Sequence, residues 1–264
     1  MRTQTAGDLL RHWRVTRRLS QLELAGRAET STRHLSFIET GRATPSRQMV
    51  LHLSDELEIP LRERNRMLLA AGYAPVYAEP ELDTPAMEPV RSAIRQILAG
   101  HEPHPALAVD AGWNMVDANA GIALFLEGAD PRLLEAPVNA LRLSLHPDGL
   151  AGRIINLAEW RGHLFERLQR QIDVSGAPEL IALLQELRGY PGGEESPGLP
   201  DPDQAVVPMR YRYDGHDLAF ISVTTVFGTP MNVTVAELAI EAFFPADAVT
   251  AALLRERIAI RADS

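Results

Sequence analysis

The sequence contains neither cysteine nor lysine among its 264 residues. Without cysteine there are no disulfides, thiolate nucleophiles or cysteine-bound zinc ions, and the chain fits a reducing compartment. Because all 26 basic residues are arginines, there is also no lysine for a P-loop or a Schiff base. No apolar run reaches the roughly 18 residues that span a bilayer, and residues 1–7 are too polar for a signal peptide. We therefore expect a cytoplasmic protein without a membrane segment.

The usual catalytic motifs are missing as well, since the sequence has no G-x-S-x-G, no H-E-x-x-H and no glycine-rich phosphate loop. His101, Glu102 and His104 come nearest to a metal-binding cluster, but Pro103 keeps them from sharing one helix face. A solvent-exposed connection explains these residues better. We expect no catalytic residues, no bound metal and no enzymatic cofactor.

Charge is distributed unevenly along the chain. The net charge is −9, but residues 1–78 carry 12 arginines against 8 acidic residues, whereas the remaining residues carry 14 against 27. A length of 264 residues is long for one compact domain, so we expect two domains of opposite charge. A basic first domain and an acidic second domain place any contact with phosphate groups in the first.

Residues 5–72 show start and stop signals for five short helices rather than one long periodic stretch. The second helix opens on Ser20 and Glu23, which have the spacing of a capping box. The third, over about residues 32–40, ends at Gly41, a residue that tolerates the left-handed conformation found after many helices. The other three are predicted over about residues 6–17, after Pro45-Ser46, and from about Pro60 to Gly72.

Beyond this helical domain, residues 75–89 combine four prolines with acidic residues and indicate a short, stiff linker. The sequence then predicts two strands, several helices, three strands and a last helix, an order typical of a PAS-like α+β domain with a five-stranded antiparallel sheet. We therefore expect domains at residues 1–74 and 90–264. The predicted strands cover about 106–110, 113–118, 205–213, 217–227 and 231–243, and the helices about 87–99, 119–126, 138–145, 151–172, 178–188 and 246–258.

The second and third predicted helices have the spacing of a helix-turn-helix, in which small and apolar residues fix the angle between the two helices. Leu24 and Ala25 on one helix, and Leu35 and Ile38 on the other, stand where the helices must touch. The segment resembles the phage-repressor-like (XRE) family, whose pattern is matched by Ser20-Gln21, Leu24-Ala25, Ser36, Ile38-Glu39, Gly41 and Pro45-Ser46. The turn departs from the family, because Glu29 and Thr30 replace a glycine and an aliphatic residue. A left-handed glutamate costs about 1–2 kcal/mol.

The resemblance implies double-stranded DNA as the partner, with the third helix in the major groove. In that family, residues at the positions of Arg14 and Glu39 form a structural salt bridge. The expected base-reading residues are Thr32, Arg33, Ser36 and Phe37. Arg33 is the best candidate, because arginine binds guanine O6 and N7 with two hydrogen bonds, and Phe37 would contact a thymine methyl group. The expected backbone-contacting residues are Gln21, His34, Arg42, Thr44, Ser46 and Arg47.

The second domain resembles the ligand-binding domain of MmyB-like regulators in His104-Pro105-Ala106, Val109-Asp110, Trp113, Asn119-Ala120, Asn139-Ala140-Leu141-Arg142 and Phe243-Phe244-Pro245. The resemblance implies a PAS-like pocket for a small apolar molecule, with a fatty acid as the suggested ligand class. Expected lining residues are Trp113, Phe125, Trp160, Phe165, Met209, Tyr211, Phe220, Phe227 and Met231, with Arg142, His163 or Arg212 meeting a carboxylate. Each aromatic residue is also explained as plain core, and Arg142 as a structural contact.

Three functional hypotheses follow from these patterns. The first is a homodimeric bacterial regulator of transcription that binds a pseudo-palindromic operator and responds to an apolar effector. The second is a DNA-binding head with a protein-interaction body, as in an antitoxin or a sigma-factor partner, without a small-molecule ligand. The third is an enzyme fused to a DNA-binding head, for which the sequence offers no catalytic constellation.

Overall fold

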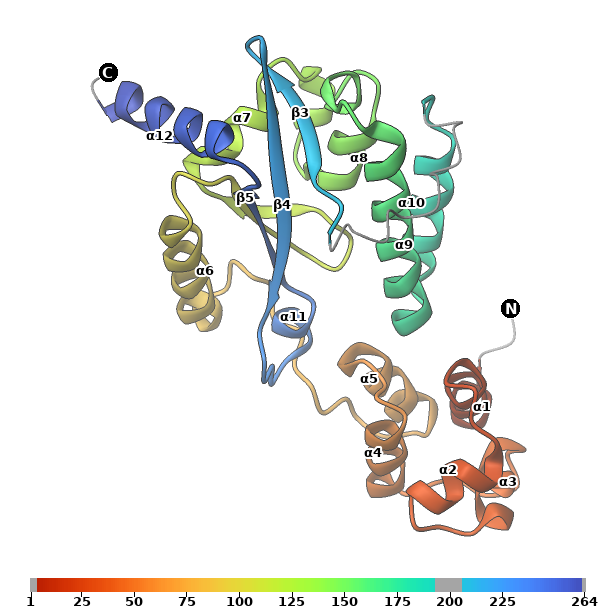
Figure 1. The fold of residues 1–264 in the computed structure, drawn as a ribbon. Coiled ribbons are helices and arrows are strands. Elements are labelled where there is room, and N and C mark those ends of the chain that lie inside the picture. Colours follow the sequence, from red (N-terminus) through yellow and green to blue (C-terminus); the bar gives the residue numbers. More distant parts are fainter. Residues whose placement is uncertain (1–3, 193–205, 263–264) are drawn as a thin grey trace. The chain divides into compact units, whose positions relative to one another are not determined.

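The computed structural model describes residues 4–192 and 206–262, with side chains up to residue 256. The chain divides into two compact units: the first holds the residues up to Glu79 together with Gln171–Gly176 and Pro230–Val233, and the second holds the rest of the described chain. The first is all-helical and the second combines helices with a five-stranded antiparallel sheet, which confirms the predicted two-domain fold class (Figure 1).

Five helices build the first domain, and each begins where a local signal places it. They are α1 (Ala6–Thr16), α2 (Gln21–Arg27), α3 (Thr32–Glu39), α4 (Arg47–Glu56) and α5 (Leu61–Ala70). The Ser20 hydroxyl accepts a hydrogen bond from the Glu23 amide at 3.1 Å, and the Glu23 carboxylate accepts one from the Ser20 amide at 2.7 Å. This reciprocal pair is the predicted capping box. Trp13, Leu24, Leu35 and Leu68 meet in one apolar core.

Two backbone features set the geometry around α3. In the turn before it, Glu29 has a φ of 46°, so the glutamate adopts the left-handed conformation that the sequence implied. On its other side, Gly7 of α1 approaches the end of α3 so closely that an added Cβ would lie 2.4 Å from the carbonyl oxygen of Ile38. No side chain fits there. Gly7 therefore allows α1 to pack tightly against α3.

The segment that follows α5 is tied to that helix. Asn65 of α5 is buried, and its side-chain amide donates to the carbonyl oxygen of Tyr77 at 2.7 Å while its oxygen accepts from the amides of Val76 and Tyr77. Arg62 pairs with Glu79 at 2.8 Å. The first part of the expected linker is thus hydrogen-bonded to the first domain.

The sheet of the second domain has the strand order β2-β1-β5-β4-β3, with every neighbouring pair antiparallel. Its strands are β1 (Ala106–Val109), β2 (Met115–Ala118), β3 (Met209–Tyr213), β4 (His216–Val226) and β5 (Ala239–Pro245). The register pairs Met209 with Phe220 and Leu107 with Glu241, so these side chains share one face of the sheet. Ala108 and Ile240 are paired on the other face.

Helices cover both faces of this sheet, as Figure 1 shows. The face that carries Ile240 packs against α6 (Glu88–Gly100), and we call it the α6 face. The opposite face, which carries Phe220 and Glu241, contacts α7 and α9, and we call it the inner face. The remaining elements are η1 (Pro85–Met87), η2 (Ala120–Ile122), α7 (Ala123–Leu126), η3 (Pro131–Leu134), α8 (Ala140–Leu145), η4 (Ala151–Arg153), α9 (Leu157–Ser175), α10 (Pro178–Arg188), α11 (Val233–Ala236) and α12 (Ala248–Ala262).

Several predicted boundaries are wrong for identifiable reasons. The helix expected over 151–172 is split, because residues 154–156 dock on β3: the Ile155 amide donates to the carbonyl oxygen of Arg210, and Asn156 bonds both Arg210 and Pro208. Side-chain hydrogen bonds of this kind compete with helix formation. The main helix, α9, therefore starts only at Leu157.

Three predicted strands also start later than expected. The Asp110 carboxylate accepts hydrogen bonds from the amides of Gly112 and Asn114, which forms a turn and delays β2 to Met115. The strand expected over 231–243 begins only at Ala239, because Val233–Ala236 form a short helix with Val233 fully buried. Here packing overrides the strand preference of β-branched residues. The strand expected from residue 205 begins at Met209, and residue 205 itself lies outside the described residues.

Candidate nucleic-acid interface and ligand site

The two sides of α3 have opposite character. Leu35, Ile38 and Glu39 are buried against the rest of the first domain, at the three-to-four spacing of one helix face. The other side carries exposed Arg33 and half-buried Phe37. The hydroxyl of Ser31 caps the helix by accepting a hydrogen bond from the His34 amide at 3.1 Å. A short, capped helix whose buried side is anchored in the core therefore presents a polar outer face of fixed orientation.

On this outer face Phe37 lies between two arginines. The guanidinium carbon of Arg33 is 5.3 Å from the centre of the Phe37 ring, and that of Arg42 is 6.0 Å from it. Both distances are within the range of cation–π attraction, worth about 0.5–1 kcal/mol at exposed sites. The ring is therefore within cation–π distance of two exposed cations. The expectation that Phe37 contacts a thymine methyl group remains a prediction.

A buried polar network lies behind α3. Glu39 accepts hydrogen bonds from Arg14 at 2.6 and 2.9 Å and from the side-chain amide of Gln21 at 2.7 Å. Burial opposes ionisation of Glu39, but the hydrogen bonds from Arg14 and Gln21 outweigh it and lower the pKa of the carboxyl group. Arg14 also donates to the carbonyl oxygen of Leu19, so one guanidinium joins α1, α3 and the start of α2. Gln21 is the first residue of α2, where we expected a phosphate contact, and its side chain is engaged in this network.

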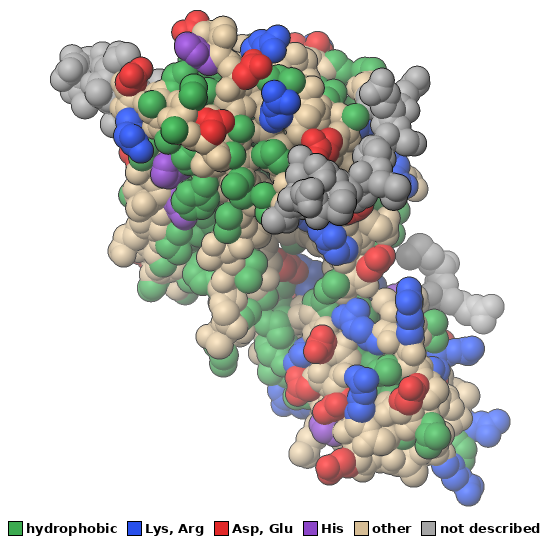
Figure 2. Space-filling view, in the orientation of Figure 1, with side chains coloured by type: hydrophobic (Ala, Val, Ile, Leu, Met, Phe, Trp, Pro, Cys, Tyr) green, Lys and Arg blue, Asp and Glu red, His purple; other side chains and the backbone are tan. Residues whose placement is uncertain are grey.

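The other expected DNA-contacting residues lie around α3 and the start of α4. Thr32, His34 and Ser36 are half-buried on α3, whereas Arg42, Thr44, Ser46 and Arg47 are exposed in the loop after it and at the start of α4. The Ser46 hydroxyl caps α4 by accepting from the Met49 amide at 3.2 Å. Figure 2 shows arginine side chains projecting from the surface of the first domain. Exposed arginines are among the side chains that commonly contact phosphate in protein–DNA complexes.

The inner face of the second domain carries a cluster of aromatic rings around Phe125 of α7. The centre of its ring is 5.4 Å from those of Tyr211 and Phe220 and 5.1 Å from that of Phe243. All three contacts are edge-on, the arrangement that aromatic pairs prefer. Phe125, Tyr211 and Phe220 are expected lining residues, and so is buried Met209, which is paired with Phe220. Sequence reasoning missed Phe243.

A buried ion pair lies on the same face. Arg167 of α9 donates to Glu241 of β5 at 2.8 Å, and the side chain of Glu241 is only 5% exposed. Arg167 also donates to Thr224 of β4, and its guanidinium carbon is 4.6 Å from the centre of the Trp113 ring. Trp113 is thus buried beside a charged pair rather than among purely apolar groups. Arg167 and Glu241 were not expected to contribute, because 74 residues separate them and neither belongs to a motif.

Trp160 and His163 stack on α9, with ring centres 5.4 Å apart. The indole of Trp160 donates to the Ser144 hydroxyl at 3.2 Å. Burial lowers the pKa of His163, and nearby Arg167 and Arg170 lower it further. Both effects favour the neutral form of the ring over the charged form that would pair with a carboxylate.

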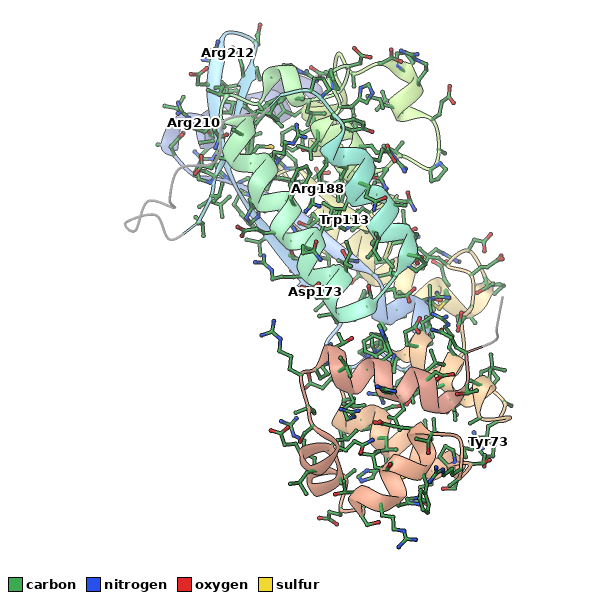
Figure 3. All side chains as sticks on the ribbon, turned by 90° about the vertical axis from the view of Figure 1, so that its right-hand side faces the viewer. Tyr73, Trp113, Asp173, Arg188, Arg210 and Arg212 are labelled. Carbon is green, nitrogen blue, oxygen red and sulfur yellow. The ribbon has the colours of Figure 1, made fainter. Side chains whose placement is uncertain are left out.

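Five expected ligand contacts have other partners or face elsewhere. Arg142 forms two hydrogen bonds of 2.8 Å with Glu186, and Arg212 pairs with Asp217, so both arginines are structural. Phe165 packs between Arg161 and Arg188, Phe227 packs on the α6 face, and Met231 is 85% exposed. Figure 3 shows Trp113 inside the second domain, and Arg210 and Arg212 at its periphery on β3.

Two family models match the chain. A helix-turn-helix domain matches residues 5–67, and the MmyB-like transcription regulator ligand binding domain matches residues 90–256, which is more than half of the chain. The chain belongs to the MmyB-like transcription regulators. No curated protein matches it. In this MmyB-like regulator, the helix-turn-helix match runs from α1 into α5 and identifies the first domain as DNA-binding. The other match identifies the second domain as the ligand-binding domain.

None of the helices in residues 4–192 and 206–262 combines the length and the apolar character that crossing a bilayer requires.

Proposed function

We propose that this MmyB-like regulator reads a specific DNA sequence with the outer face of α3 and changes its DNA affinity when a small apolar effector of the fatty-acid class binds the second domain. The observation that carries the DNA-reading role is the triad of Arg33, Phe37 and Arg42. Arg33 forms the pair of hydrogen bonds with guanine, while Arg42 meets the phosphate backbone. Thr32 and Ser36 complete the base-reading surface, and His34, Thr44, Ser46 and Arg47 contribute backbone contacts.

In this proposal the protein acts as a cytoplasmic bacterial homodimer. Two recognition helices then enter successive major grooves, about 34–36 Å apart, on a pseudo-palindromic site. The effector acts by binding the DNA-competent and DNA-incompetent states with different affinity, because a ligand with equal affinity for both shifts neither. The apolar rings around Phe125 support the ligand class, and the motifs give no support for catalysis.

The test of DNA reading begins with selection of a binding site from random duplexes by the purified full-length protein. Fluorescence anisotropy then compares the selected duplex with a scrambled duplex over a range of salt concentrations. We expect tight binding to the selected site, and a salt dependence that reports the number of phosphate contacts. Equal affinity for both duplexes would contradict sequence-specific reading.

The effector and the assembly need separate measurements. Extraction of the protein purified from cells, followed by mass spectrometry, identifies any retained small molecule and its class. Light scattering of the eluted protein gives the mass, which we expect to be twice the 29.1 kDa of one chain. A protein that binds its site as a monomer, or that retains only polar molecules, would contradict the corresponding part of the proposal.

A further inference from the structure

Two buried polar atoms on the inner face of the second domain have no hydrogen-bond partner in the described part of the chain. They are the phenolic oxygen of Tyr211 and one terminal guanidinium nitrogen, Nη2, of Arg153. Tyr211 is fully buried. Leaving such a group unsatisfied costs about 1–3 kcal/mol, so proteins rarely leave two of them close together.

The two side chains lie against each other. The guanidinium carbon of Arg153 is 5.3 Å from the centre of the Tyr211 ring. The backbone enforces this contact, because Ile154 pairs with Tyr211 in an isolated bridge next to β3. Asn156 secures the same segment by donating to the carbonyl oxygen of Pro208 at 2.9 Å and accepting from the Arg210 amide at 2.9 Å. Arg153 is therefore held in place rather than free to turn to solvent.

Both atoms are available as hydrogen-bond donors, so the ligand group that binds them must be an acceptor. Burial raises the pKa of Tyr211 to about 12, although nearby Arg153 lowers it, so the phenol keeps its proton at neutral pH and donates. Arg153 has no acceptor atoms and carries a permanent positive charge. Its other terminal nitrogen, Nη1, already donates to the carbonyl oxygen of Glu127. The two unpartnered groups, Nη2 of Arg153 and the Tyr211 hydroxyl, thus suit one negatively charged group with two acceptor oxygens.

The side chains around this pair of donors are aromatic, and they favour an apolar body for the rest of the ligand. Tyr211 contacts Phe125 edge-on, and Phe125 contacts Phe220 and Phe243, so aromatic rings extend from the donor pair across the inner face. An apolar group gains by lying on such rings, whereas a second charged group would lose its hydration without compensation.

We propose that Arg153 and Tyr211 form the polar anchor of the effector site and bind the carboxylate of a ligand whose remaining body is apolar. This inference rests on the proposed function, because it assigns residues and a head group to the effector. It replaces Arg142, His163 and Arg212, the three side chains that the sequence suggested for this role.

The test compares two probes of equal chain length, decanoate and 1-decanol, by isothermal titration calorimetry with the full-length protein freed of bound small molecules. The wild type is expected to prefer decanoate. Tyr211→Phe and Arg153→Gln each lower the affinity for decanoate about ten-fold and leave that for decanol nearly unchanged, because a hydrogen bond to a charged group is lost. Two control variants, Arg212→Gln and Tyr190→Phe, remove an arginine and a phenol that have partners elsewhere, and both keep the wild-type preference.

A melting curve provides an independent readout. Tyr211→Phe is expected to melt at or above the wild-type temperature, since its hydroxyl group has no partner within the described chain. A clearly lower melting temperature would show that the hydroxyl has an internal role, and would overturn the anchor. An unchanged preference for decanoate in both variants, or a wild type that binds only decanol, would also overturn it while leaving an apolar effector in place. A wild type that binds neither probe but still binds its DNA site would contradict the proposed effector class as well.

Discussion

Arg14 and Glu39 form a bidentate ion pair, with nitrogen–oxygen distances of 2.6 and 2.9 Å, between the first helix and the recognition helix α3. Their side chains are 11% and 2% exposed. The pair therefore fixes the orientation of α3 from its buried side, and the base reading that we propose for its exposed side depends on that orientation.

Loss of one member of this pair should destabilise the first domain strongly. We expect Arg14→Met to lower the free energy of unfolding by about 3 kcal/mol, because it leaves the buried Glu39 carboxylate without its counter-charge. Scanning calorimetry of the full-length protein measures the shift of the first-domain transition. The double variant Arg14→Met/Glu39→Met should recover much of the loss. A single variant that melts within a degree of wild type would show that the pair contributes little.

The role of Arg33 is tested on DNA. Arg33→Ala should weaken binding to the selected site by about 1–3 kcal/mol, roughly five-fold to more than a hundred-fold, and binding to scrambled DNA much less. Anisotropy titrations at one salt concentration give both values. Arg132→Ala, which removes a 77% exposed arginine of the second domain, is the matched control. If Arg33→Ala weakens binding to all sequences equally, Arg33 contacts phosphate rather than bases.

Phe37 should act through the two arginines that flank it. Phe37→Leu keeps an apolar side chain but removes the aromatic face, so we expect a smaller loss of specific affinity than in Arg33→Ala. A double-mutant cycle separates the effects, since Phe37→Leu should cost less once Arg33 is absent. Fully additive losses would instead support a direct contact of Phe37 with a base.

Relief of backbone strain should stabilise the turn before α3. Glu29→Gly places a residue without Cβ at a φ of 46°, and we expect the first domain to gain about 1 kcal/mol. The control Gly41→Ala, at a φ of 72°, should lose a similar amount. Calorimetry of both variants checks the signs, and a destabilised Glu29→Gly protein would mean that the glutamate side chain has a role that outweighs the strain.

His163 should make the second domain less stable in mild acid. Its pKa is lowered in the folded state by burial and then by Arg167 and Arg170, so the unfolded chain takes up the proton first as the pH falls. The stability that the neutral ring contributes is present above the ordinary pKa of histidine, about 6.5, and is lost as the pH falls below it. Between pH 7.5 and 5.5, the melting temperature of the second-domain transition should fall by a few degrees less in His163→Gln than in wild type. Equal decreases would contradict this assignment.

The sequence predicted the first domain well because its signals are local. Ser20 with Glu23, and the left-handed Glu29, are recognised within a few residues of the elements they define. Gln21 was placed on the correct helix, but its partner Glu39 is 18 residues away, so its side-chain hydrogen bond could not be read locally. Gly7 gave no signal at all, since only the packing of α1 on α3 shows why a side chain is excluded.

In the second domain, the order of strands was predictable, but not every side-chain contact was predicted correctly. Phe220 and Phe227 both appeared as aromatic residues of one predicted strand and both were expected to line the pocket, yet they pack on opposite faces of the sheet. Seven residues separate them, so the alternation of side chains along a strand already places them on opposite faces, and the expected lining set did not take this into account. Arg153 was expected within a regular helix, and only the docking of the following residues on β3 shows its contact with Tyr211.

The alternation along β5 restricts how the sheet can transmit a binding event. Glu241 points to Arg167 on the inner face, while its neighbours Ile240 and Ala242 point to the helix that follows the inter-domain segment. Sliding β5 by one residue would push a carboxylate into the apolar layer beneath α6 and leave Arg167 facing isoleucine. The strand is therefore held in its register from both sides at once, by the ion pair on the inner face and by the apolar layer under α6.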